Sequence, residues 1–114
     1  MTSPRRAALE AMVAADPADT MARLLLGNDC LADGDMAAAE AHLARYLAGV
    51  GADPGRADVG AACLSLSKAR EALGDLPGAL AALAHGIGSA TAFRHRALLD
   101  ALVAERDRLA PGGS

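Results

Sequence analysis

Aromatic residues are almost absent from this chain of 114 residues, which has no tryptophan, one tyrosine and one phenylalanine. Proteins that bind nucleic acids usually stack bases on aromatic side chains and present a basic face. Here 14 acidic residues outnumber 11 basic ones and the net charge is −3, so no nucleic-acid partner is expected. The scarcity of aromatic and β-branched residues also argues against a β-sandwich or a barrel.

Cysteines and long apolar runs are scarce as well. Cys30 and Cys63 form no CxxC motif, so they predict small buried side chains rather than a zinc site. No apolar run approaches the roughly 20 residues that cross a bilayer. Glu10 and Asp16 interrupt the stretch that would otherwise resemble a secretion signal. We therefore expect a cytoplasmic protein with no membrane association, no metal and no cofactor.

Alanine and leucine dominate instead, with 30 and 17 residues respectively. Both are strong helix formers, so the composition predicts an all-α fold. Proline, glycine and aspartate divide the chain into six helices with short connections. The expected helices span residues 4–15, 18–32, 36–48, 54–73, 76–86 and about 89 or 91 to 109. Together they form one domain over residues 1–110, followed by a disordered tail at 111–114.

Particular residues mark the expected helix ends. Asp35 and Asp53 are predicted to cap the third and fourth helices, the latter with Pro54 at its first position. Gly86 and Gly88 are predicted to end the fifth helix, because glycine is common just after helix C-termini.

An internal repeat emerges when the chain is compared with itself at a shift of 40 residues. The coincident pairs include Leu26 with Leu66, Gly34-Asp35 with Gly74-Asp75, Ala39 with Ala79, and Leu43 with Leu83. Matches between alanines are common by chance in this composition, but a Gly-Asp turn with leucines at fixed offsets on both sides is not. The second and third helices are thus predicted to form one hairpin, and the fourth and fifth its copy.

The hairpins resemble the tetratricopeptide repeat, whose 34-residue unit has the pattern W-x2-L-G-x2-Y, then A-x3-F, then P. Leu26-Gly27 match its Leu-Gly, Cys30 stands at its Tyr, and Ala39 and Leu43 stand at its Ala and Phe. The resemblance implies a helical solenoid with full units at 20–53 and 60–93, an N-terminal half unit and a capping helix at about 91–109. Small bacterial proteins of this layout are common in the family.

The chain departs from the family pattern in two ways. No large aromatic residue remains at a pattern position, and Arg23 and Cys63 stand where the pattern has Trp. The period is also six residues too long, with the excess at about residues 54–59. This excess either extends the fourth helix or forms an extended loop.

The resemblance implies a concave groove that is lined by the first helix of each hairpin and holds an extended or helical peptide. The groove positions carried over are Met21, Leu24, Leu25, Asn28, Leu31, Ala61, Leu64, Ser65, Lys68 and Glu71. Asn28 matches a position at which many peptide-binding members hydrogen-bond the ligand backbone, and Lys68 is its equivalent one unit later. In the alternative interpretation, Asn28 is simply solvated and Lys68 pairs with Glu71.

No catalytic constellation is evident in the sequence. Nucleophilic catalysis needs a base beside the nucleophile, and no histidine follows Ser65 at helical spacing. His42, His85 and His95 stand singly on three predicted helices, so no metal site is expected.

We therefore expect a non-catalytic adaptor or scaffold whose partner is a peptide or protein segment. The competing hypothesis is a self-associating structural protein, in which a homodimer covers the groove at Leu24 and Leu64.

Overall fold

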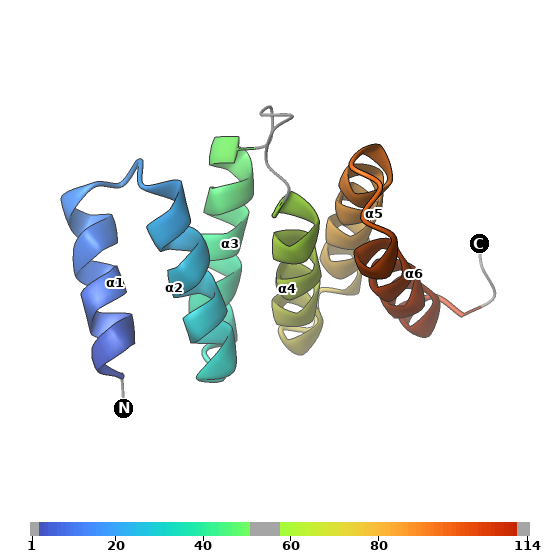
Figure 1. The fold of residues 1–114 in the computed structure, drawn as a ribbon. Helices are drawn as coiled ribbons and strands as arrows, with labels where there is room; N and C mark the ends of the chain where they lie inside the picture. Colours follow the sequence, from blue (N-terminus) through green and yellow to red (C-terminus); the bar gives the residue numbers. More distant parts are fainter. Residues whose placement is uncertain (1–2, 51–57, 112–114) are drawn as a thin grey trace.

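The structure, a computed structural model, describes residues 3–50 and 58–111, over which the chain forms six α-helices and no strand. The helices are α1 (Pro4–Ala15), α2 (Thr20–Ala32), α3 (Met36–Val50), α4 (Val59–Ala72), α5 (Leu76–Ala92) and α6 (Arg96–Leu109). Each helix packs against the next one in the chain, so that α1 and α6 lie at opposite ends of a row (Figure 1). The expected all-α class is thereby confirmed.

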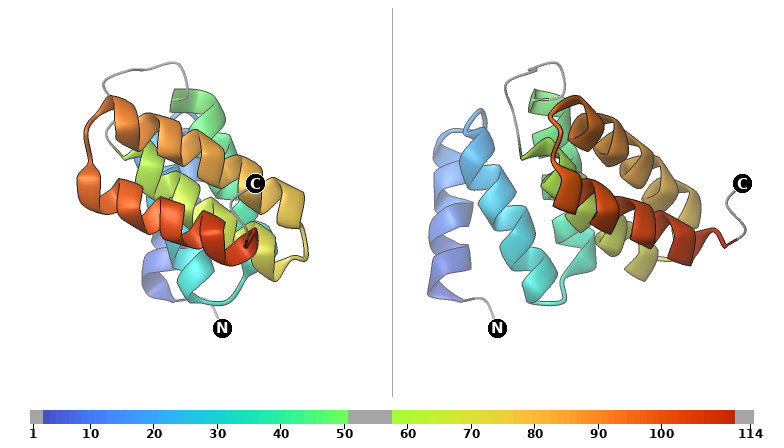
Figure 2. Two further views of the ribbon diagram at one scale, coloured as in Figure 1. Left: turned by 90° about the vertical axis from the view of Figure 1, so that its right-hand side faces the viewer. Right: turned by 45° about the vertical axis from the view of Figure 1, so that its right-hand side comes forward.

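Alternate helices also meet. α2 contacts α4, and α4 contacts α6. Seen from the end of the row that holds α6, this last helix lies across α4 and beside α5 (Figure 2). The side chains of α6 therefore reach residues of both helices of the preceding hairpin.

Aspartate side chains begin three of the helices. Asp35 accepts a hydrogen bond from the backbone N–H of Ala38 at 3.3 Å, which confirms the predicted cap, and Asp75 accepts one from Gly78 at 2.9 Å. The carboxylate of Asp19 caps α2, so that helix begins at Thr20 and not at residue 18. Each of these carboxylates satisfies a backbone donor that the first turn of a helix leaves free.

The turns inside the two hairpins have the same backbone geometry. Gly34 and Gly74 have φ angles of 81° and 80°, a left-handed conformation that glycine adopts without strain. In each turn, the glycine N–H donates to the carbonyl three residues before it, and the following aspartate N–H donates to the carbonyl five residues before it. This agreement supports the predicted copying of the first hairpin in the second.

The predicted boundary between the fifth and sixth helices is wrong. α5 continues through Gly86 and Gly88 to Ala92, and α6 begins at Arg96, so Phe93 lies between the two helices rather than on α6. Gly86 is buried, and its lack of a side chain makes room for the neighbouring helices instead of ending α5. The turn occurs at Arg94, which adopts φ 57° and repeats the hydrogen bonds of the two glycine turns.

Two other predicted boundaries concern α3 and α4. α3 extends two residues beyond the predicted end, to Val50. α4 begins at Val59, and Asp58 occupies the position before it without forming a side-chain cap. The predicted helix start at Pro54 and the cap at Asp53 lie in 51–57, outside the described residues, as does most of the six-residue excess.

The core consists of leucines packed between small residues. Leu26, Leu43, Leu83 and Leu102 are almost fully buried, together with Tyr46 and both cysteines. Cys30 and Cys63 are free thiols, as expected for small buried residues. Leucines fill the volume that alanines and glycines leave between closely spaced helices.

Glycines occupy several of the helix crossings. A Cβ atom on Gly27 would lie 2.8 Å from Cγ of Leu43, and one on Gly86 would lie 2.8 Å from Cβ of Cys63. Such distances are too short for real carbon contacts, so the helix axes are as close at these crossings as glycine allows.

Ion pairs connect helices that are distant in sequence. The Arg6 guanidinium of α1 donates to the carboxylates of Asp35 at 2.8 Å and Asp33 at 3.5 Å, both in the turn between α2 and α3. Arg70 of α4 similarly donates to Glu40 of α3 at 3.4 Å. These polar contacts favour one relative orientation of helices whose other contacts are mainly apolar.

Leu83→Ala should destabilise the protein strongly, because Leu83 is fully buried and its loss leaves a cavity. We expect the free energy of unfolding to fall by about 2–5 kcal/mol in a urea titration. Leu73→Ala makes the same chemical change at a side chain that is 49% exposed and should cost less than about 0.5 kcal/mol. Equal losses in the two variants would show that Leu83 is not a core residue.

Two glycine substitutions on α5 should have opposite effects. A Cβ on Gly86 would meet Cys63 at 2.8 Å and Leu102 at 3.0 Å, so Gly86→Ala should destabilise the fold by roughly 1–3 kcal/mol. A Cβ on Gly88 would have no neighbour within 4 Å, so Gly88→Ala should stabilise it by about 0.5–1 kcal/mol through reduced chain entropy. Thermal melting of both variants tests these two predictions. A higher melting temperature for Gly86→Ala would contradict the close packing of α5 against α4 and α6 at Gly86.

Candidate binding groove

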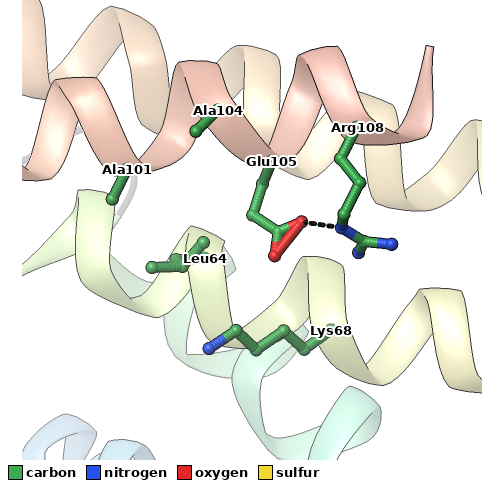
Figure 3. A pocket seen from close by; sticks show the side chains of 6 residues that line it. All are labelled: Leu64, Lys68, Ala101, Ala104, Glu105 and Arg108. Atoms are coloured by element: carbon green, nitrogen blue, oxygen red, sulfur yellow. Dashed lines mark hydrogen bonds and ion pairs between the residues drawn. The ribbon is translucent and has the colours of Figure 1, made fainter. Parts of the chain in front are cut away.

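A groove of about 300 Å³ runs between α4 and α6. Its lining residues are Leu64, Lys68, Ala101, Ala104, Glu105 and Arg108 (Figure 3). Leu64 and the two alanines give it an apolar floor at one end, Glu105 and Arg108 lie toward the other end, and Lys68 runs along one side (Figure 3). The arrangement can hold an apolar side chain beside a hydrogen-bonding or charged group.

Residue size explains why a groove forms here. Ala101 and Ala104 stand three positions apart on α6, a spacing that places both on one face of the helix. Across from them, Leu64 is half-buried and packs against the core cluster that contains Leu83 and Leu102. Since the alanines carry no atoms beyond Cβ, the space next to Leu64 stays unfilled.

Arg108 organises the charged end of the groove. Its guanidinium donates to both carboxylate oxygens of Glu71, at 2.7 and 3.0 Å, and to Glu105 at 2.8 Å. The hydrogen bond from Arg108 lowers the pKa of Glu71 below its ordinary value, and the two carboxylates raise the pKa of Arg108. Glu71 of α4 is therefore an anion at neutral pH, and its carboxylate is bound to Arg108 of α6.

Lys68 has no ion-pair partner in the described part of the chain, although it is exposed at the edge of the groove. The alternative interpretation pairs Lys68 with Glu71, but in this structure that carboxylate binds Arg108 through both oxygens. Lys68 extends its amino group along α4 toward Leu64 (Figure 3). This ammonium is thus available to a group that enters from solvent.

The groove residues predicted on α2 do not line this groove. Leu24 is only 8% exposed and belongs to the core cluster shared by α1 to α5, so little of its surface faces solvent; its contact with a ligand stays a prediction. Leu25 and Leu31 are half-buried and pack against the same cluster. Met21 and Asn28 are exposed on the surface of α2.

The predicted residues on α4 have different outcomes. Leu64 and Lys68 line the groove, whereas Ala61 is exposed and Ser65 half-buried outside it. Glu71 does not line the groove but fixes Arg108, which does. The four residues of α6 were missed because that helix was interpreted only as a cap.

Burial controls the reactivity of the two cysteines. The thiols of Cys30 and Cys63 have raised pKa values, that of Cys63 at about 11, because burial disfavours the thiolate. Both stay protonated and weakly nucleophilic at neutral pH. Within residues 3–50 and 58–111, no three potential ligands gather to hold a metal ion, and none of the helices has the length and apolarity to span a bilayer.

Comparison with known proteins adds no identification. The chain matches no family model, and neither the curated proteins nor the solved structures gave a match. The resemblance to the tetratricopeptide repeat therefore rests on the sequence pattern.

His42 of α3 is expected to make the stability of the protein depend on pH. Its Nδ1 lies 3.4 Å from Nη1 of Arg23, and partial burial together with this positive charge lowers the pKa of His42 below its ordinary value of 6.5. Below pH 6.5 the unfolded chain binds a proton that the folded chain resists, so stability should fall as the pH decreases from 7.5 to 5. His42→Gln should reduce this slope in urea titrations.

His85→Gln serves as the control, because it removes an exposed histidine from α5 and reports the effect of net charge alone. A slope that is the same in wild type and His42→Gln would contradict the assignment to His42.

Proposed function

We propose that this protein is a non-catalytic interaction module, an adaptor or scaffold, that binds a peptide or protein segment in the groove between α4 and α6. The observation that carries the proposal is that an apolar floor lies beside an ammonium group with no ion-pair partner among the described residues. Leu64, Ala101 and Ala104 form the floor, and Lys68 lies at its edge. In this proposal the helices stack as in a tetratricopeptide solenoid, with α2, α4 and α6 on the concave side.

The groove offers a segment two kinds of contact. An apolar side chain buries its surface on Leu64 and the alanines, at about 25 cal/mol per Å² removed from water. The ammonium of Lys68 donates to a backbone carbonyl or a carboxylate of the segment, and the charge-assisted bond fixes its register. Arg108, already held by Glu71 and Glu105, acts as a fixed wall.

Self-association is the second candidate function. It is favoured by large apolar side chains that remain exposed, namely Met12, Met21, Leu73 and Leu76, each between 43% and 49% accessible. A homodimer that covers Leu64 would use the same groove. Leu24, however, is buried within the monomer and is not a residue that such a dimer would cover.

Filling the groove tests the proposal. Ala104→Leu adds a side chain at an exposed position on the floor, so it should displace the segment without unfolding the protein. We expect peptides selected from a random library to bind wild type and to lose at least about tenfold in affinity for Ala104→Leu, measured by fluorescence anisotropy. Lys68→Gln should weaken peptides that carry a carboxylate.

Ala84→Leu, at an exposed site on α5 outside the groove, is the matched control and should leave affinity unchanged. Light scattering of the same variants separates the two candidates. A dimer of wild type that Ala104→Leu converts to monomer supports self-association. Peptide binding and mass that are both insensitive to Ala104→Leu would exclude the groove.

A further inference from the structure

A second hollow, of about 460 Å³, lies where α2 begins and α3 ends. Its lining residues are Pro17, Ala18, Thr20, Arg23, Arg45, Ala48 and Gly49. Apart from the two arginines, one from each helix, the lining is small and carries no charge. This hollow is remote in sequence from the groove between α4 and α6 and shares no residue with it.

Neither arginine has a carboxylate partner among the described residues, a feature that they share with Arg94. Six other arginines form such ion pairs: Arg5, Arg6, Arg70, Arg96, Arg106 and Arg108. A shortage of acids is not the cause, since the chain has more acidic than basic residues. Two like charges therefore line one hollow with no carboxylate paired to either among residues 3–50 and 58–111, an arrangement that an anion would relieve.

One of the two guanidinium groups is held in place. Nη2 of Arg23 donates to the backbone carbonyl of Pro17 at 3.2 Å, and its Nη1 lies 3.4 Å from Nδ1 of His42. Arg45 is exposed and has no such restraint, so it can close on a ligand from the α3 side. One fixed and one adjustable cation suit a ligand with two or more acceptor oxygens.

Two carboxylates close to Arg23 in the sequence accept hydrogen bonds from backbone N–H groups. Asp16 accepts from the backbone N–H of Ala18 at 3.1 Å, and Asp19 accepts from that of Ala22 at 3.0 Å. They stabilise the turn and the start of α2 rather than the arginines. Burial lowers the pKa of His42, and the neighbouring charge of Arg23 lowers it further.

We infer that this hollow binds the oxyanion group of a small ligand, a phosphate or a carboxylate, between Arg23 and Arg45. The planar guanidinium groups match the paired oxygens of either anion, and the volume lies within the range of small-molecule sites. The small side chains of Ala18, Ala48 and Gly49 leave room for the remainder of the ligand. The site is independent of the peptide groove.

The test is an amide NMR titration with inorganic phosphate and, separately, with acetate, each compared with chloride at equal ionic strength. We expect shifts concentrated at residues 18–23 and 45–49. Arg45→Gln should weaken the binding about tenfold, because a charge-assisted hydrogen bond is worth roughly 1.5 kcal/mol or more and its removal leaves Arg23 alone. Arg45 is exposed, so this variant should retain the fold.

Arg94→Gln is the matched control. It removes an equal charge from another exposed arginine without a carboxylate partner in the described residues, at the turn between α5 and α6. Its titration should match that of wild type. Response to phosphate alone or to acetate alone assigns the ligand as a phosphoryl or a carboxylate compound. Shifts equal to those with chloride, or unchanged in Arg45→Gln, would overturn the inference.

Discussion

Close approach of helices at small side chains is the constraint on which the rest of this structure depends. A chain with two aromatic residues cannot fill wide gaps between helices, so its backbones must come together. Gly27 meets Leu43 in the first hairpin, and Gly86 meets Cys63 in the second, at distances that exclude any Cβ atom. At each crossing a leucine or cysteine side chain contacts the backbone of the glycine. These contacts replace the contact area that aromatic rings would supply.

The same reliance on small residues produces the hollows. Where a leucine stands opposite a glycine, the crossing is filled; where Leu64 stands opposite Ala101 and Ala104, space remains. Alanines on the floor of the groove thus leave space open to solvent, whereas alanines in the core allow helices to pack closely. Both result from the high alanine content of the chain. The ion pair between Arg108 and Glu71 adds a polar contact between α6 and α4.

Much of the fold could be predicted from the proline, glycine and aspartate residues at helix ends. Their conformations have local causes, since Asp35 caps a helix and Gly34 adopts a left-handed φ. The turn at Arg94 could not be predicted, since arginine carries no preference for φ 57° and Gly86 offered a false stop. Within the groove, Leu64 and Lys68 were predicted from the repeat register. Leu24 stands at the position in the first hairpin that corresponds to Leu64 in the second, but Leu24 is buried. Burial depends on which neighbouring helices cover that face of the hairpin, and the sequence of one hairpin does not determine this.

The last helix links stability to the proposed binding. α6 contributes Leu102 to the core, where it is fully buried, and four of the six residues that line the groove. A ligand that contacts both α4 and α6 therefore stabilises the docked position of α6, by an amount set by its concentration relative to its dissociation constant. The reverse also follows from linkage: weakening the ion pair between Arg108 and Glu71 loosens one wall of the groove and so lowers affinity. The terminal helix that contributes to the core therefore also supplies four of the six residues of the candidate binding site.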